Sequence, residues 1–226
     1  MKSLSDESVK TQAKSRNAGI SGFFCDMNGR GTMNTFYAGN REIWRQWLCN
    51  HFETEEEIWL VFPVKASGEE SISYNDAVEE ALCFGWIDGR AGTLDRLHHI
   101  RRFTPRRKGS GYSQPNIERL LWLDRQGMLH PKIRESVKDL LEKPFVFPQD
   151  ILDVLRRDET VWRNYCAFSA PYKRIRIAYI DAARKRPAEF EKRLQNFIAK
   201  TRENKRIVGY GGIDKYYADS AEPEER

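Results

Sequence analysis

A basic segment without carboxylates is the part of the sequence best suited to hold an anion. No Asp or Glu occurs between Asp95 and Glu118. Within this interval, six of the thirteen residues from Arg96 to Lys108 are Arg or Lys, and two more are His. Each guanidinium group can donate two parallel hydrogen bonds to a carboxylate or phosphate. The segment therefore predicts a binding site for a small anionic ligand.

Residues on either side of this segment complete the predicted site. Trp86 and Asp88 precede it in the run CFGWIDG, and Ser113 follows it as the expected N-cap of a helix. A helix start offers free amides and a positive dipole end, which both favour an anion. Arg106 is the leading contact because Pro105 stiffens the backbone before it. We expect the ligand-binding residues to be Trp86, Asp88, Arg101, Arg106, Arg107, Ser113 and Asn116.

The same residues also have simpler explanations. Charged side chains on a solvated strand edge discourage aggregation, and this would explain the arginines equally well. A structural salt bridge from Asp88 to Arg101 or Arg106 is favoured over a role of Asp88 as general base. Cys83 would be a nucleophile only if nearby arginines lowered its pKa, whereas most single cysteines on apolar helix faces are buried. Asp88 and Cys83 are thus weak catalytic candidates, and we expect a binding protein rather than an enzyme.

Composition limits the class of protein. The chain has 226 residues and a formal net charge of +5, and 40% of its residues are hydrophobic. These values are typical of a soluble globular protein with one large or two small domains. The mild charge does not favour nucleic-acid binding by the whole chain. A nucleic-acid-binding face over residues 96–108 is therefore a third hypothesis, after a binding protein and an enzyme.

The sequence indicates neither a metal site nor a cofactor. Its four cysteines are far apart and form no C-x-x-C pair, and no glycine-rich nucleotide-binding motif occurs. His98 and His99 are consecutive, so on a strand they point to opposite faces. We expect the thiols to be reduced, and the sequence shows neither an apolar signal segment nor a membrane-spanning run. These features predict a cytoplasmic protein that is not inserted in a membrane.

The elements expected to position these residues are helices and strands up to residue 126 and helices alone from residue 131 onward. Apolar residues at helical spacing predict helices, and short β-branched and aromatic runs predict strands. Ser73 is an expected N-cap, and Gly85 an expected left-handed C-terminal residue of the same helix. Helices are predicted at 40–50, 73–84 and 113–126 and from 131 onward, and strands at 57–64, 86–88 and 99–107.

The predicted fold is α+β. A small antiparallel sheet with packed helices forms the N-terminal part, and a helical C-terminal part follows. The predicted divisions are a weakly ordered extension at 1–33, a core domain at 34–145, a helical region at 146–206 and a Gly-rich polar tail at 207–226. The extension is polar and rich in Ser and Gly, so it cannot bury enough apolar surface to offset the entropy of ordering.

Several of these motifs resemble one protein family. The chain contains the block YNDAVEEALCFGWIDG from Tyr74, the block FTPRR from Phe103 and the later block APYKRIRIAYIDAARKRPAEF. These blocks occur in the order typical of the YdeI or OmpD-associated family, which is labelled bacteriocin-protection. The resemblance covers roughly residues 36–206. Tyr112 and Tyr172 depart from it, standing where relatives have Trp and Ser, and we expect both to reshape pocket walls. The resemblance implies a bacterial α+β protein with a helical C-terminal part and no defined reaction, so the leading hypothesis is a cytoplasmic binding or stress-accessory protein.

Overall fold

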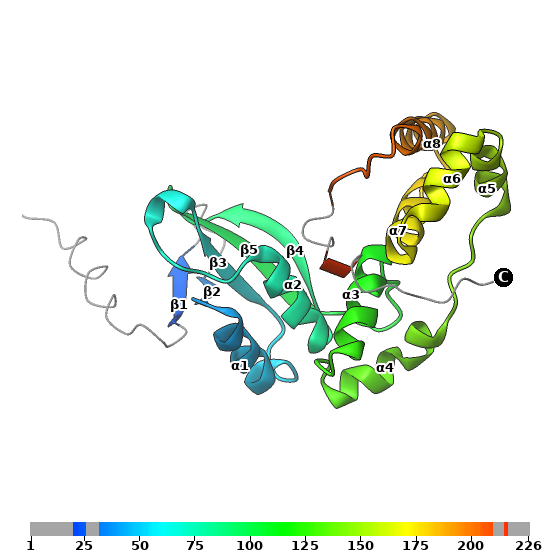
Figure 1. The fold of residues 1–226 in the computed structure, drawn as a ribbon. Coiled ribbons are helices and arrows are strands. Elements are labelled where there is room, and N and C mark those ends of the chain that lie inside the picture. Colours follow the sequence, from blue (N-terminus) through cyan, green and yellow to red (C-terminus); the bar gives the residue numbers. More distant parts are fainter. Residues whose placement is uncertain (1–19, 26–31, 210–214, 217–226) are drawn as a thin grey trace, which may run out of the picture. The chain divides into compact units, whose positions relative to one another are not determined.

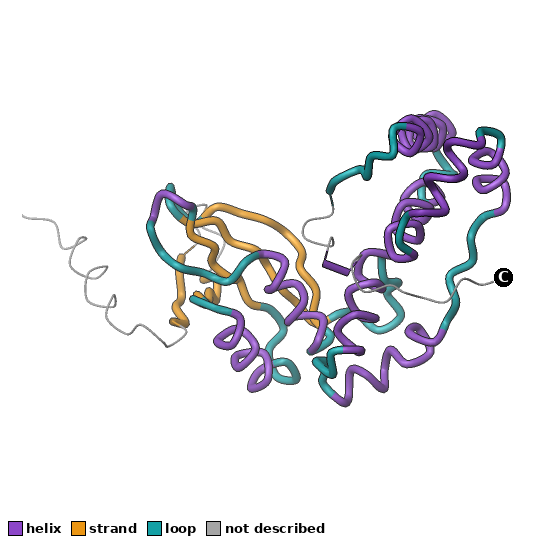
Figure 2. The backbone as a smooth tube through the Cα atoms, viewed as in Figure 1, coloured by secondary structure: helices purple, strands orange, loops and turns teal. Residues whose placement is uncertain are grey.

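The computed structural model describes residues 20–25, 32–209 and 215–216 (Figure 1). The chain divides into two compact units, and the division in the sequence falls between Lys108 and Gly109. Unit 1 contains the strands, and in the described part of unit 2 the regular structure is helical (Figure 2). The predicted α+β class is therefore confirmed.

Unit 1 is built on a five-stranded sheet. Its strands are β1 (Ile20–Cys25), β2 (Thr32–Tyr37), β3 (Ile58–Pro63), β4 (Trp86–Thr93) and β5 (His98–Pro105), in the order β1-β2-β3-β5-β4. β2 and β3 are parallel, and the other neighbouring strands are antiparallel. The sheet is thus mixed and not wholly antiparallel as predicted. The helix α1 (Arg41–His51) lies between β2 and β3 in the chain, and parallel strands require such a crossover.

β1 lies within the segment predicted to be a weakly ordered extension. It pairs with β2 along its whole length, from Ile20 opposite Tyr37 to Cys25 opposite Thr32. Residues 20–25, with the sequence ISGFFC, are richer in apolar side chains than the rest of the predicted extension, and they pair with β2 as a strand. The weakly ordered extension as a whole stays a prediction. Residues 1–19 and 26–31 of the same segment lie outside the described residues.

Two helices pack on one face of the sheet through aromatic side chains. Trp44 and Trp47 of α1 stack with ring centroids 5.2 Å apart, and Phe103 of β5 meets Trp44 edge-on at 5.4 Å. Trp86 meets Trp47 edge-on at 5.7 Å, is fully buried, and donates its indole N–H to the carbonyl of Phe52 at 3.1 Å. The second helix, α2 (Tyr74–Cys83), starts with the predicted cap, in which the Ser73 hydroxyl accepts from the amide of Asp76, and is followed by Gly85 at φ 73°.

Successive side chains of β5 point to opposite faces of the sheet, and this determines which of them can share a site. Phe103 belongs to the helix-bearing face, so His99 and Arg101 lie on that face too. Ile100 packs on the opposite face with Trp59. His98 and Arg102 share this opposite face, so each pair of neighbouring basic residues is divided between the two faces.

Unit 2 is described as six helices. They are α3 (Gln114–Arg125), α4 (Pro131–Glu142), α5 (Gln149–Arg156), α6 (Glu159–Ala167), α7 (Ala170–Asp181) and α8 (Pro187–Arg202). The core of α5–α8 includes Ile151, Leu155, Val161, Tyr165, Tyr172, Ile177, Ile180, Leu194 and Phe197.

Two features of unit 2 differ from the predicted divisions. α3 and α4 lie in this unit, although the predicted core domain grouped them with the sheet, because α3 packs on α7 and Glu118 accepts two hydrogen bonds from Arg174. The region after residue 206, predicted to be a polar tail, contributes apolar contacts. Ile207 packs against the helical core, and Tyr216 is buried beside Trp122.

Replacing Trp86 by Ala should lower the free energy of unfolding by about 3–5 kcal/mol, because the substitution empties a large aromatic site and removes a buried hydrogen bond. Urea unfolding followed by circular dichroism measures the change. Leu97→Ala is the control, since Leu97 is 43% exposed and should change stability by less than about 0.5 kcal/mol. An unchanged midpoint for Trp86→Ala would mean that the aromatic cluster does not hold unit 1 together.

Candidate functional site

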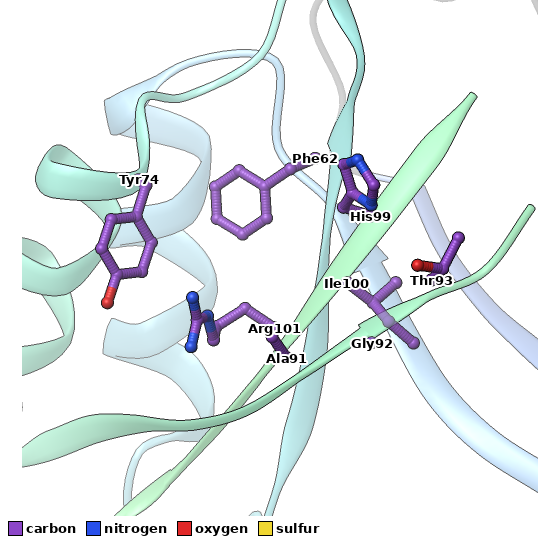
Figure 3. Close-up of a pocket in the computed structure, with 8 residues that line it drawn as sticks. All are labelled: Phe62, Tyr74, Ala91, Gly92, Thr93, His99, Ile100 and Arg101. Atoms are coloured by element: carbon purple, nitrogen blue, oxygen red, sulfur yellow. The ribbon is translucent and has the colours of Figure 1, made fainter. Parts of the chain in front are cut away.

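An open groove lies on the helix-bearing face of the sheet, beside the first residue of α2. Its volume is about 500 Å³, and it is lined by Phe62, Tyr74, Ala91, Gly92, Thr93, His99, Ile100 and Arg101 (Figure 3). The strand register builds its floor, because Phe62, His99 and Thr93 are direct cross-strand neighbours. Arg101 and Ala91 form the next row toward α2.

Arg101 is held at one end of this groove by three neighbours. Its guanidinium lies 4.9 Å from the ring centroid of Tyr74, donates to the carbonyl of Gly89 at 3.1 Å, and approaches a carboxylate oxygen of Asp88 at 3.8 Å. Asp88 also accepts a hydrogen bond of 2.6 Å from the Tyr74 hydroxyl. The predicted structural salt bridge of Asp88 to Arg101 is therefore confirmed. A shift of the β4 register between Asp88 and Ala91 turns the backbone at Gly89 toward this arginine.

Of the basic segment, His99 and Arg101 line this groove, but not all of its cations converge there. Arg102 lies on the other face and donates to Glu57 at 2.8 Å. His98, also on that face, contacts Asp95 at 2.8 Å and Glu69 at 3.2 Å. Burial alone would lower the pKa of His98, but its hydrogen bonds to these two carboxylates raise it. Carboxylates from elsewhere in the fold thus neutralise charges that the local sequence leaves unbalanced.

The other predicted ligand residues are divided between the two units. In unit 1, Arg106 follows β5 and donates its backbone N–H to Gly85 at 2.9 Å, and Arg107 is exposed. In unit 2, Ser113 is an exposed N-cap whose side chain makes no capping hydrogen bond, and Asn116 accepts from Arg119 at 2.9 Å. A pocket that joins these residues therefore stays a prediction.

Two predicted site residues are enclosed by protein. Trp86 is fully buried, so it is a core residue and presents no surface to a ligand. Cys83 is also fully buried, and burial, with a smaller contribution from Glu80, raises the pKa of its thiol to about 12. The condition for a nucleophilic role, a lowered pKa, is not met. At neutral pH this thiol is protonated and behaves as a small apolar side chain.

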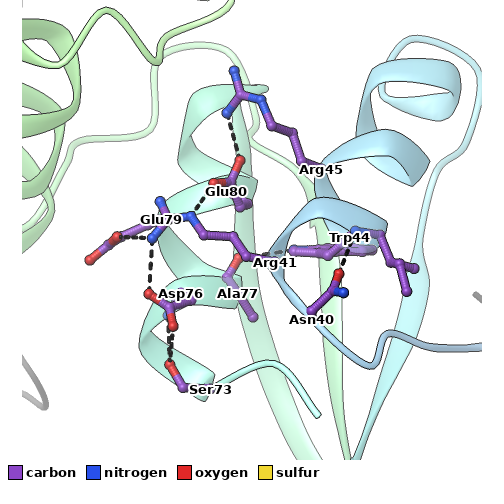
Figure 4. Close-up of polar contacts among 10 residues, drawn as sticks. Asn40, Arg41, Trp44, Arg45, Ser73, Asp76, Ala77, Glu79 and Glu80 are labelled. Atoms are coloured by element: carbon purple, nitrogen blue, oxygen red, sulfur yellow. Dashed lines mark hydrogen bonds and ion pairs between the residues drawn. The ribbon is translucent and has the colours of Figure 1, made fainter. Parts of the chain in front are cut away.

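Sequence reasoning missed a buried ion network that joins α1 to α2. Glu79 and Glu80 are fully buried, although they are adjacent carboxylates. Arg41 donates to Asp76 and Glu79 at 2.9 Å each and also to Glu80, while Arg45 donates to Glu80 at 2.6 Å (Figure 4). The signal was present in the run AVEEAL, since two acids inside an apolar helix segment require buried cations. Guanidinium groups already occupy both buried carboxylates, so the network is structural.

Family models match the two parts of the chain separately. Residues 36–136 match a model described as Domain of unknown function (DUF8412). Residues 144–204 match the model described as Bacteriocin-protection, YdeI or OmpD-Associated. The C-terminal segment of the chain is thus similar to this family. The YdeI or OmpD-associated segment comprises α5–α8, so the resemblance is confirmed there, while the groove of unit 1 falls in the other matched domain.

The remaining comparisons add no relative. Neither a curated protein nor a solved structure matches the chain closely enough to be called similar. Within residues 20–25, 32–209 and 215–216, no group of three or more His, Cys, Asp or Glu side chains could hold a metal ion. No helix in the described part of the chain is both long and apolar enough to cross a membrane.

Replacing Arg41 by Ala should lower the free energy of unfolding by about 3–5 kcal/mol, because it leaves two buried carboxylates without their main cation. Chemical denaturation measures the loss. Arg134→Ala is the matched control, since the Arg134 side chain is 62% exposed and its ion pair with Asp124 contributes at most about 1 kcal/mol. Equal effects of the two substitutions would show that the α1–α2 network contributes no more than a surface pair.

Proposed function

We propose that unit 1 is a small-molecule binding module and that its groove holds a small anionic ligand through Arg101. The observation that supports this most directly is an arginine fixed in place at the end of an open groove with aromatic walls. Binding sites of this kind are concave and mostly apolar, with a few placed polar groups, and their volumes are typically about 300–1,000 Å³. The groove of about 500 Å³ falls in this range.

The ion pair of Arg101 leaves room for a ligand. Its distance to Asp88 is 3.8 Å, and the Arg101 side chain is 30% exposed. Such a long and partly hydrated pair contributes little to stability, so a ligand carboxylate or phosphate can compete with Asp88 for the guanidinium. The Tyr74 ring restricts the guanidinium, which reduces the entropy lost on binding. His99 lines the same groove and offers a second donor.

The apolar walls limit the shape of the ligand. Phe62 and Tyr74 meet edge-on with ring centroids 6.4 Å apart. Opposite them, Ala91 of β4 has a small side chain, which keeps the floor flat. A compact acid with a planar or apolar body fits this combination better than a fully hydrated anion.

The cellular role we propose is that of a cytoplasmic binding or accessory protein. Cys49, Cys83 and Cys166 are free cysteines, as is typical of proteins in a reducing compartment. Two rival hypotheses receive less support. An enzyme would need a reactive group, but Asp88 is paired and Cys83 is buried. A nucleic-acid-binding face would need a continuous basic surface, but Arg101 and Arg102 lie on opposite faces of the sheet.

Arg101→Ala should weaken binding of a simple aromatic acid such as benzoate by about tenfold or more. A charge-assisted hydrogen bond contributes about 1.5–3 kcal/mol, and about 1.4 kcal/mol corresponds to tenfold in affinity. Arg101→Lys should restore part of the affinity, since an ammonium lacks the paired donor geometry. Isothermal titration calorimetry with benzoate and with inorganic phosphate measures both effects.

Arg102→Ala is the matched control, because Arg102 is the next residue on the same strand and pairs with Glu57 on the opposite face. It should leave the affinity unchanged. The proposal fails if the parent protein binds neither probe, or if Arg102→Ala loses as much affinity as Arg101→Ala.

A further inference from the structure

A second groove lies in unit 2 between α7 and α8, and its volume is about 370 Å³. Side chains of Tyr179, Ile180 and Phe197 form apolar parts of its wall. Residues Ile207–Gly209, which follow α8 in the chain, lie along one side of it. This groove is separate from the one in unit 1, and what it binds does not depend on the function proposed above.

The chain recognises its own residue Ile207 in the way that a protein recognises a peptide ligand. The backbone N–H of Ile207 donates to the Tyr172 hydroxyl at 2.8 Å, and its carbonyl accepts from the Arg176 guanidinium. The Ile207 side chain packs against the helical core. The protein thus contacts both backbone polar groups of Ile207 and its side chain. In many peptide complexes, likewise, backbone hydrogen bonds supply affinity and a side-chain pocket supplies specificity.

The two recognising side chains are held in place before any ligand arrives. Tyr172 and Arg176 are four residues apart on α7, so they share one face of the helix. They are 1% and 4% exposed, and the Arg176 guanidinium lies 5.5 Å from the centroid of the Tyr172 ring. Such pre-organised donors and acceptors lose little entropy on binding.

The chain's own segment forms one side of the groove and leaves the rest of it open. Val208 is 84% exposed at this side. The remaining lining includes Lys192, Arg193 and Asn196 of α8, with Glu189 as a single carboxylate. Together with Arg176, the lining contains three cations and one anion. Glu189 pairs with Arg193 at 2.8 Å, so the net positive charge of the lining comes from Lys192 and Arg176 and would favour acidic groups on a ligand.

We propose that the α7–α8 groove recognises an extended segment of another protein, one with a branched aliphatic residue and flanking acidic residues, and that Ile207 occupies the same position in the unbound chain. The aliphatic residue takes the place of the Ile207 side chain. Its N–H and C=O replace those of Ile207 at Tyr172 and Arg176. The acidic residues lie against the basic part of the groove wall.

The test uses the full chain and a synthetic peptide as probe. Ile207→Asp should vacate the position, because a carboxylate is costly to bury against the apolar core. Val146→Asp is the matched control, since Val146 is also an aliphatic residue of unit 2, is 80% exposed, and does not line this groove. The probe is a fluorescent, end-blocked peptide of sequence E-I-V-G-E, and a second peptide, E-D-V-G-E, lacks the aliphatic anchor. Fluorescence polarisation measures the affinity, and circular dichroism confirms that each variant is folded.

Ile207→Asp should bind the first peptide about tenfold more tightly than the parent protein and the Val146→Asp variant do, because a vacated site no longer requires displacement of the chain's own residue. Adding Tyr172→Phe or Arg176→Gln should reverse most of this gain. Ile207→Gly, which removes the anchor without adding a charge, gives the same readout if the Asp variant unfolds.

The proposal is overturned if the folded Ile207 variants bind the peptide no better than the parent, or if the peptide without the anchor binds equally well. Formation of a stable dimer by the Ile207 variants would also overturn it, since the occupant would then be a second copy of this chain.

Discussion

The burial of two adjacent carboxylates is the constraint on which unit 1 depends. Glu79 and Glu80 can be buried only because Arg41 and Arg45 reach them from α1, so the two helices must pack in one register. Beneath them, the aromatic cluster around Trp44 fills the space above the sheet. α2 consequently begins at Tyr74, and the sheet rows beyond that residue are left uncovered by the helix pair. The groove is therefore a consequence of where the buried network places the start of α2.

The fold was largely predictable where local chemistry determines structure. The Ser73 cap, the left-handed Gly85 and the buried Trp86 follow from side-chain hydrogen bonding, backbone sterics and apolar burial, and each is visible within a few residues of sequence. Strand β1 was not predictable in this way, because the polar stretch around it indicated a weakly ordered extension. The parallel pairing of β2 with β3 was not predictable either, because it joins residues 24 positions apart. The same holds for Ile207, whose packing against α7 and α8 contradicts its place in a Gly-rich segment.

The candidate site was predictable only in part, for an electrostatic reason. Charge counted along the chain suggested an unbalanced basic segment, but an ion pair joins residues that are close in space. Arg102 is balanced by Glu57, which lies 45 positions earlier, and His98 by Glu69, which lies 29 positions earlier. Strand alternation then divides the remaining cations between two faces. The ion pair between Arg101 and Asp88 was predicted correctly because it crosses neighbouring antiparallel strands. The hydrogen bond from Tyr74 to Asp88 was not predictable, because it depends on where the helix α2 starts in space.

The central claim is that a small anion binds on the helix-bearing face of unit 1 at Arg101. A titration of the ¹⁵N-labelled full chain with benzoate, followed by backbone amide chemical shifts in ¹H–¹⁵N spectra, tests this directly. The account predicts saturable shifts at Tyr74, at Ala91–Thr93 and at His99–Arg101, with little change elsewhere. Shifts concentrated at Arg106–Lys108 and at Ser113–Asn116 would contradict it, and would show that the anion binds where the basic segment ends instead of in the groove.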